Sequence, residues 1–500
     1  MKTMYVEKYS GTFVKLGRFS LSRKKLYKIL RNNDWNPVYT KVYEKKGNDF
    51  LPFRLNLIQF FQLFFFSHVY QIKSPDRMVL YPFATRSRNL VISYRSDNGM
   101  TKSKRFRQFW AYFLATIMNT MFPMNRPMIV YEKLSDRAQE SGYAYFKYMN
   151  KYHAKEPVYF LIKLDSPDID KLYGLKNIVV HGSFKHFYLL IRSKLFISSE
   201  TPGHAYFWRE NMGLTANVVR TKPYVFLQHG VLGFKKLDNL FYGDRLTAPV
   251  RLITSSQFEQ DIVTKQLGYD ASRAPITGLA RWDLIDLPKE RMNVRDKILF
   301  FYTWRPWLDD VDDETFVQSE YFLAIKKSIK QISKLSSDKK IIVMMHPKMH
   351  AALNSSDMLN IKLWTDNDGP LNELMSSVAL LVTDYSSLSW EAYYREIPVV
   401  FKMFDKERYE KEVDSYINLD ELPFGINGSG DLSFALAKAE EQNFHLRPEE
   451  LLNKSKYFAY EDQGASERIH EVVQNIDLKS INRDKRRSMI QAILRLIRSK

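Results

Sequence analysis

The sequence contains no cysteine among its 500 residues. This absence excludes disulfide bonds, thiolate zinc sites and a cysteine nucleophile, so the fold must rest on packing alone. Glycine and proline, at 19 each, are scattered, and no internal repeat is visible. Hydrophobic residues at 45% and aromatics at 14% are ample for burial, which excludes disorder for the bulk of the chain. Because a single core stops growing at roughly 250–300 residues, we expect two domains and an extension.

Long hydrophobic runs are also absent. Residues 1–23 alternate apolar residues with Lys and Arg and lack the uninterrupted apolar core of a signal peptide, so we expect no secretion. Two aromatic-rich stretches, residues 55–70 and 106–122, fall short of the roughly 20 apolar residues that a membrane span needs. The second stretch follows four basic residues at 102–107. This pattern is typical of an interfacial helix at lipid headgroups and, equally, of a buried helix that joins two domains.

Acidic residues are in the minority, because 75 Lys and Arg against 56 Asp and Glu give a net charge of +19. Such a charge indicates a polyanionic partner, whether nucleic acid, anionic lipid or a phosphate-rich substrate. The charge is uneven, since residues 478–500 hold eight Lys or Arg and one acid, with apolar residues near helical spacing. This tail is typical of a basic amphipathic helix on an anionic membrane surface, although a helix packed on the protein fits the same pattern.

Apolar runs divide the chain into five predicted segments. Residues 1–100 combine alternating runs with turn clusters, which predicts a β-rich accessory domain, and residues 101–126 form the connecting or interfacial helix. Continuous apolar runs alternate with helical segments over residues 127–287 and again, after a charged link, over 288–475. Residues 476–500 are the basic tail. Because this alternation marks parallel sheets buried on both faces, we expect an α/β protein with two Rossmann-like lobes facing a cleft and an N-terminal β-rich extension.

Polar residues follow three of the predicted strands, at the carboxyl ends where parallel sheets meet their ligands. The run 224–227 ends in Gln228-His229-Gly230, the run 341–345 ends in His346, and the run 379–383 ends in Asp384-Tyr385-Ser386-Ser387. A histidine there is able to take a proton from a substrate hydroxyl near neutral pH, although a structural hydrogen bond is the commoner use of a single histidine. Two histidines at corresponding strand ends of the two lobes favour the catalytic interpretation.

Ser386 and Ser387 stand where the next helix is predicted to begin. Free backbone N–H groups and hydroxyls at a helix start form an anion site suited to a diphosphate, and plain N-capping is the alternative. Glu391 lies one turn into this helix, where it could accept hydrogen bonds from donor ribose hydroxyls or could be a solvated surface acid.

Three cations are further candidates for phosphate or acceptor contacts. Arg305 follows the first strand of the second lobe, and Lys235 and Lys236 follow the His229 loop. Planar arginine and flexible lysine both suit phosphate oxygens, and each of the three could instead be a surface charge. The sequence contains no GxxxxGK[ST] phosphate loop and no HExxH, and the acids at 309–313 indicate a solvated loop. We therefore expect neither a metal nor a cofactor.

Five motifs in a fixed order carry a resemblance to a known family. They are His229-Gly230, Lys235-Lys236, Tyr302-Thr303-Trp304-Arg305, His346-Pro347 and Thr383-Asp384-Tyr385-Ser386-Ser387. In this order they resemble the CDP-glycerol glycerophosphotransferase family of teichoic acid and capsule synthesis. The similarity extends over roughly residues 180–415 and takes in Ser183 to Ser198 and Thr277 to Asp283.

The resemblance implies a GT-B fold and a metal-independent transfer of glycerol phosphate, or a related polyol phosphate, from a CDP-alcohol donor to a polymer hydroxyl, with release of CMP. The roles it implies are a general base at His229, donor-diphosphate contacts at His346, Ser386 and Ser387, and cleft-lining positions at Arg305 and Asp384. The expected acceptor is a lipid-linked, phosphate-rich cell-envelope polymer. The expected location is peripheral, on the cytoplasmic side of an anionic membrane.

The sequence departs from the family pattern beside the candidate base. The family commonly has tryptophan before the histidine and threonine after the glycine, whereas this chain has Gln228 and Val231. The acceptor side is therefore predicted to differ, and glycerol and ribitol donors, priming and polymerisation all stay open. A GT-B glycosyltransferase using a nucleotide sugar is the alternative enzyme. A nucleic-acid-binding protein is the third hypothesis, but recognition signatures are lacking and the basic residues concentrate in the tail, so we expect no nucleic acid partner.

Overall fold

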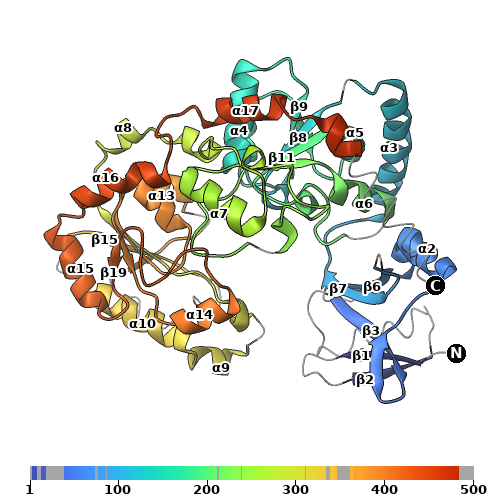
Figure 1. Cartoon of the computed structure of the whole chain (residues 1–500), viewed down its shortest axis with the longest axis horizontal. Coiled ribbons are helices and arrows are strands. Elements are labelled where there is room, and N and C mark those ends of the chain that lie inside the picture. The colour runs from blue at the N-terminus through green and yellow to red at the C-terminus, as the bar shows by residue number, and fades with distance from the viewer. Residues whose placement is uncertain are drawn as a thin grey trace. The chain divides into compact units, whose positions relative to one another are not determined.

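The computed structural model of the chain describes most of its length (Figure 1). The described residues are 3–7, 13–18, 39–73, 77–85, 87–124, 126–210, 213–237, 239–309, 311–333, 338–345, 349, 361–365 and 368–483. Two predictions fall outside them: His346, and the amphipathic part of the basic tail at residues 484–500.

The N-terminal region is an antiparallel sheet, as its alternating runs predict. Its strands are β1 (Thr3–Glu7), β2 (Phe13–Arg18), β3 (Tyr39–Lys46), β4 (Asp49–Pro52), β5 (Ile72–Lys73), β6 (Met78–Ala84) and β7 (Leu90–Ser96). The strand order is β2-β1-β3-β7-β6-β5, with β4 paired to β3. Helix α2 (Leu57–Phe66) packs beside β6 and contributes Leu63 to the apolar core of this sheet. The sheet thus has a core of its own.

Helix α3 (Lys102–Met121) occupies the stretch where the sequence predicts a connecting or interfacial helix. Thr101 caps it by accepting a hydrogen bond from the Lys104 amide. Small residues, Ala111 and Ala115, form its buried side, and α3 packs against α5 (Phe184–Arg192). Among the described residues, no helix combines the length and apolar character that crossing a bilayer requires.

Two six-stranded sheets follow. The first has the order β10-β9-β8-β11-β12-β13, formed by β8 (Met128–Tyr131), β9 (Val158–Ile162), β10 (Ile178–Val180), β11 (Leu195–Ser198), β12 (Tyr224–Phe226) and β13 (Arg251–Leu252). The pairs β10–β9, β9–β8 and β8–β11 are parallel. The associated helices are α4 (Ser141–Tyr152), α5, α6 (Gly213–Thr221), α7 (Gln257–Leu267) and α8 (Leu287–Glu290).

The second six-stranded sheet has the order β16-β15-β14-β17-β18-β19 and is parallel throughout. Its strands are β14 (Lys297–Phe301), β15 (Lys340–Met344), β16 (Ile361–Leu363), β17 (Val378–Thr383), β18 (Val399–Phe401) and β19 (Ile426–Asn427). Its helices are α9 (Asp313–Val317), α10 (Glu320–Ile332), α12 (Leu371–Met375), α13 (Leu388–Tyr394), α14 (Lys406–Glu412), α15 (Leu432–Glu441) and α16 (Pro448–Tyr457). Helix α17 (Ala465–Gln474) instead contacts α4, where the Tyr145 hydroxyl lies 3.3 Å from the His470 ring. The β17 side chains are all buried, as a strand covered on both faces requires.

The described residues form two compact units. The first comprises those within 1–138, 149–225 and 476–483, and the second those within 139–148 and 226–475. All residues of the site described next belong to the second unit.

Candidate functional site

A pocket of about 550 Å³ lies in the second unit, where the loops after β12, β14 and β17 meet. Its volume is within the range of small-ligand sites, about 300–1,000 Å³. Its lining includes His229, Lys235, Ser386, Ser387 and Glu391 from the sequence predictions. Strand ends therefore converge on one pocket, as the carboxyl edge of a parallel sheet favours.

The backbone turns sharply after β12, and the turn leaves His229 exposed in the pocket. Gln228 has a φ of +63°, in the left-handed region. Its amide points inward, where Nε2 donates to the Ile253 carbonyl and to Glu259 Oε1, each at 2.9 Å. A polar side chain that is nearly fully buried thus anchors the residue before the histidine, and this satisfies the need of a buried amide for partners.

Glu259, in the first turn of α7, fixes the other end of the same loop. Its carboxylate accepts the Leu232 amide at 2.7 Å and the Ser255 amide at 2.6 Å. Burial raises the pKa of Glu259 to about 7, and these hydrogen bonds act in the opposite direction. The loop that carries His229 is therefore held by one buried carboxyl group.

Two glycines in this loop are explained by close approach. A Cβ at Gly230 would lie 3.3 Å from the Ser387 Cβ, and one at Gly233 would lie 3.0 Å from the Trp390 ring. The His229 loop and the start of α13 are therefore in contact, so His229 and Ser387 line the same pocket from adjacent segments.

Ser386 and Ser387 have different surroundings at the start of α13. The Ser386 hydroxyl is nearly buried and accepts the Leu388 amide at 3.1 Å. Ser387 is exposed, and its hydroxyl makes no capping hydrogen bond to the first turn. Simple capping therefore accounts for Ser386 and leaves the Ser387 hydroxyl facing the pocket.

Arg305 and Asp384 require a correction. The resemblance predicts that both line the donor cleft, but both are completely buried and neither is among the residues that line the pocket. Arg305 contacts Asp384 at 2.8 Å and forms a fork on Asp405 with distances of 2.7 and 3.0 Å. Five aromatic rings surround the guanidinium at 5.1–5.9 Å: Trp307, Tyr321, Tyr385, Phe404 and Tyr409.

The buried cluster of Arg305, Asp384 and Asp405 contacts a residue that lines the pocket. Asp384 accepts hydrogen bonds from the Thr303 amide and hydroxyl, both at 3.0 Å, and Thr303 lines the pocket. Burial raises the pKa of Asp384, while Arg305 and Thr303 oppose that rise. A buried acid with this many partners is a positioning group, because none of its charge reaches the pocket surface.

Arg281 is a site residue whose role sequence reasoning missed. Its guanidinium donates to the His229 carbonyl at 2.7 Å and contacts Glu140 at 2.9 Å and Glu391 at 2.7 Å. Burial alone would raise the pKa of Glu391, but Arg281 and Arg395 hold it below its usual value. Arg281 lies in the Thr277 to Asp283 segment of the resemblance, so the segment was visible in the sequence although its partners were not.

The two lysines, Lys235 and Lys236, have different surroundings. Lys235 is exposed and lines the pocket. Lys236 also lines it but contacts Asp414 at 2.5 Å, so its charge is partly neutralised within the protein. Lys235 is therefore the better placed of the two for a ligand phosphate.

Comparison with known sequences decides the family. The sequence profile of the CDP-Glycerol:Poly(glycerophosphate) glycerophosphotransferase family matches residues 114–475. The chain belongs to this family. The matched region contains every residue of the pocket, and it leaves out the N-terminal sheet. The resemblance based on the five motifs is thereby confirmed.

Curated relatives act in teichoic acid synthesis. The minor teichoic acid biosynthesis protein GgaB of Bacillus subtilis (strain 168) is 22% identical over 403 residues, which are 76% of this chain and 43% of GgaB. The teichoic acid poly(glycerol phosphate) polymerase of Staphylococcus epidermidis is 23% identical over 439 residues, 77% of this chain and 58% of the polymerase. This glycerophosphotransferase family member therefore spans about half the length of the curated relatives it matches.

The solved structure of the wall teichoic acid polymerase TagF shares the fold. Its TM-score is 0.52 at 19% identity, over 78% of this chain and 100% of that chain. TagF with CDPG aligns with a TM-score of 0.51 at 18% identity, over the same shares. The predicted GT-B-like architecture, with two Rossmann-like lobes and a β-rich N-terminal extension, is confirmed.

Proposed function

We propose that this protein transfers glycerol phosphate, or a related polyol phosphate, from a CDP-alcohol to a hydroxyl of a teichoic-acid-type polymer. One observation carries the proposal: an exposed histidine and an exposed serine hydroxyl at a helix start share one pocket of about 550 Å³. The pocket thus combines a candidate base with an anion site, which are the two elements that phosphoryl transfer needs. Family membership and the CDPG ligand of TagF support the choice of donor.

In the proposed reaction His229 takes the proton of the acceptor hydroxyl. The resulting oxygen attacks the phosphorus next to the polyol, the bond from that phosphorus to the CMP oxygen breaks, and CMP leaves with the electron pair. Ser386 and Ser387, at the start of α13, hold the diphosphate, and Lys235 offsets its charge. His346, which lies outside the described residues, is proposed as a further diphosphate contact. We propose that no metal takes part.

Arg281 acts as a positioning residue in this scheme. It holds the His229 carbonyl while it pairs with Glu391 on α13, so one guanidinium links the base loop to the diphosphate site. Fixing both segments before the substrate binds reduces the reorganisation that the transition state would otherwise require.

The deciding experiment follows CMP release. Purified protein is incubated with CDP-glycerol, CDP-ribitol or UDP-sugars, each with a membrane fraction that carries acceptor. We expect CMP from a CDP-alcohol and no UDP from any sugar nucleotide. UDP release without CMP release would establish the glycosyltransferase alternative instead.

We further propose that the protein works on the membrane surface, at the cytoplasmic face where a lipid-linked acceptor would grow. Helix α3 supports this proposal, because one side of it exposes large apolar residues beside a basic first turn. The exposed residues are Phe106, Phe109, Trp110, Phe113, Leu114, Ile117 and Met121. Aromatic side chains at the headgroup level and basic residues toward anionic lipid are the features of an interfacial helix.

Vesicle flotation tests the membrane proposal. Replacing Phe109, Trp110 and Phe113 by serine should release the protein from anionic vesicles at both low and high salt. Phe434 and Leu452, which are also exposed but belong to the second unit, provide the matched control substitutions. Deletion of residues 479–500 should weaken flotation chiefly at low salt, because the attraction of the tail charges is screened. Flotation that is unchanged in both variants would refute the membrane proposal.

A further inference from the structure

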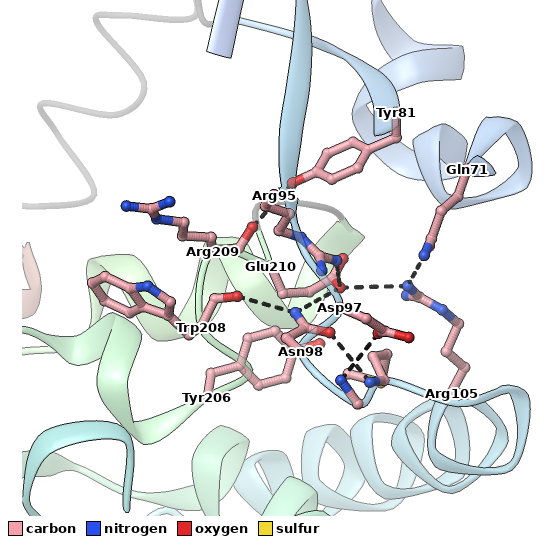
Figure 2. A network of polar contacts seen from close by, with 12 residues as sticks. Gln71, Tyr81, Arg95, Asp97, Asn98, Arg105, Tyr206, Trp208, Arg209 and Glu210 are labelled. Carbon is pink, nitrogen blue, oxygen red and sulfur yellow. Dashed lines mark hydrogen bonds and ion pairs between the residues drawn. The ribbon is translucent and has the colours of Figure 1, made fainter. Parts of the chain in front are cut away.

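A second pocket, of about 250 Å³, lies in the first unit. Its walls come from the end of β7, from the residues that follow β9 and β10, and from the segment Tyr206–Arg209. Figure 2 shows the contributions of β7 and of the segment Tyr206–Arg209. It is therefore built jointly by the N-terminal sheet and by the carboxyl ends of parallel strands. The part contributed by the end of β7 and the two residues after it, 95–98, precedes the region that the family profile matches.

Arg95, which lines this pocket, belongs to a buried ion pair. Arg95 is only 1% exposed and contacts Glu210 at 2.8 Å, while Arg105 contacts the same carboxylate oxygen at 3.5 Å (Figure 2). Two arginines thus share one acid. Arg95 Nε and Glu210 Oε1 have no hydrogen-bond partner among the described residues. A buried guanidinium N–H without a partner is costly unless a ligand or water satisfies it.

Two further cations line the pocket. Lys163 follows β9 and forms an ion pair with Asp136 at 3.7 Å, and Arg209 is exposed beside Trp208. The acid of the pocket, Asp97, contacts Lys73 at 2.5 Å. Burial lowers the pKa of the lining residue His181 to about 4, so its ring is neutral at pH 7. The lining therefore holds three cations, Arg95, Lys163 and Arg209, against one acid, Asp97. Because Arg95 pairs with Glu210 and Lys163 with Asp136, Arg209 is the cation most open to a ligand.

Arg209 is held in a strained backbone conformation. Its φ is +56°, a region that long side chains rarely adopt, and its carbonyl accepts the Tyr81 hydroxyl at 3.0 Å (Figure 2). Tyr81 on β6 is fully buried, so the N-terminal sheet fixes the loop that presents Trp208 and Arg209. Strain of this kind persists where surrounding structure maintains it, and it concentrates at functional sites.

We propose that this pocket binds a phosphodiester-linked polyol segment of the acceptor chain. In this proposal Arg209 and Lys163 contact the phosphate, and the exposed Trp208 ring packs against the carbon skeleton of the polyol. Asn98 and Asp97 line the same pocket. The proposal rests on the proposed function and gives the N-terminal sheet a role, which is to complete an acceptor subsite. A second binding site for the polymer would keep the acceptor chain bound between successive transfers.

Direct binding tests the proposal without turnover. A short synthetic poly(glycerol phosphate) oligomer is titrated by calorimetry into the full chain, at fixed salt because exposed charges are screened. The variant Arg209→Gln/Lys163→Gln should bind at least about tenfold more weakly, since each charge-assisted contact to phosphate is strong. The control Lys155→Gln/Arg220→Gln removes the same charge from exposed positions outside the pocket and should bind like wild type. No binding by wild type, or equal weakening in both variants, would overturn the proposal.

A second variant, Arg209→Gly, should leave the folded state intact, because glycine adopts a positive φ without strain. It should melt no lower than wild type and bind the oligomer more weakly than wild type, through loss of the Arg209 contact. If this variant bound the oligomer as tightly as wild type, the proposal that this pocket binds the acceptor chain would be refuted.

Two further binding measurements on the double variant Arg209→Gln/Lys163→Gln identify the ligand. CDP-glycerol binding should be unchanged in the double variant, and so should flotation on phosphatidylglycerol vesicles. A loss confined to either of these would assign the pocket to the donor or to a lipid headgroup and overturn the acceptor proposal. Intact oligomer binding in a protein that releases no CMP would refute only the proposed function.

Discussion

Replacing Arg305 by methionine should destabilise the second unit severely, because it removes a cation from between two buried carboxylates. Asp384 is completely buried and Asp405 nearly so, and they contact Arg305 at 2.8 and 2.7 Å. Breaking a buried pair by removing one partner costs about 3–5 kcal/mol, and here two partners lose their cation. We expect a loss near the upper end, about 5 kcal/mol. For a unit of this size that corresponds to a fall in Tm of roughly 10 °C or more.

The assay is urea denaturation followed by tryptophan fluorescence, with thermal melting as a second measurement. Arg291→Met is the control, because Arg291 is 48% exposed and pairs with Glu396 at the surface. Its loss should cost under about 1 kcal/mol. The double variant Arg305→Met/Asp405→Leu should recover part of the stability, because only Asp384 is then left without its cation. Asp384 also keeps its hydrogen bonds from Thr303.

The pH dependence gives an independent check. Burial already raises the pKa of Asp384, and loss of Arg305 would raise it further. A carboxyl group with a raised folded-state pKa contributes stability below its unfolded pKa and loses that contribution as pH rises through the folded value. The defect of Arg305→Met should therefore be smaller at pH 5 than at pH 8. A variant that unfolds like wild type and shows only a higher KM for the donor would refute this reasoning, because Arg305 would then be a direct ligand.

The remaining predictions concern the pocket and its supports. His229→Ala should lower turnover by about 100-fold or more while donor affinity stays near wild type, measured by CMP release and calorimetry; wild-type turnover would remove His229 from the mechanism. Ser387→Ala should raise the KM for the donor by about tenfold through loss of one hydrogen bond to a charged group, whereas an unchanged KM would place the diphosphate elsewhere. Because we propose that no metal takes part, EDTA should leave the rate of CMP release unchanged. Strict Mg²⁺ dependence of the chemical step would contradict the metal-independent proposal. Burial raises the pKa of Glu259 to about 7, so this group contributes stability below its unfolded pKa and loses it as pH rises toward 7. Glu259→Gln should therefore flatten the fall in stability between about pH 4.5 and 7, and an unaltered profile would assign that fall to other groups.

Much of the fold was predictable from hydrophobic patterning. The apolar runs predicted at 224–227, 341–345 and 379–383 coincide, within a residue at each end, with β12, β15 and β17, because a strand buried on both faces must be continuously apolar. The edge strands β16 and β19 went unpredicted, since edge strands are short and partly exposed and carry little pattern. The sequence also placed His229, Ser386 and Ser387 at strand ends, and the structure brings them to one pocket.

Only the tertiary structure decided which charges face a ligand. Arg305 and Lys235 look alike in sequence as cations after a strand, yet Arg305 is enclosed by two acids and five rings while Lys235 lies in the pocket. Gln228, read as a departure from the family pattern, is an inward anchor on Glu259, a contact between residues 31 positions apart. Arg281, Glu140 and Glu391 meet from three separate segments. Such partners are set by the packing of distant elements, and local periodicity holds no information about them. The sequence alone determined the family and the strand ends, whereas burial determined which of their charges remain available to a substrate.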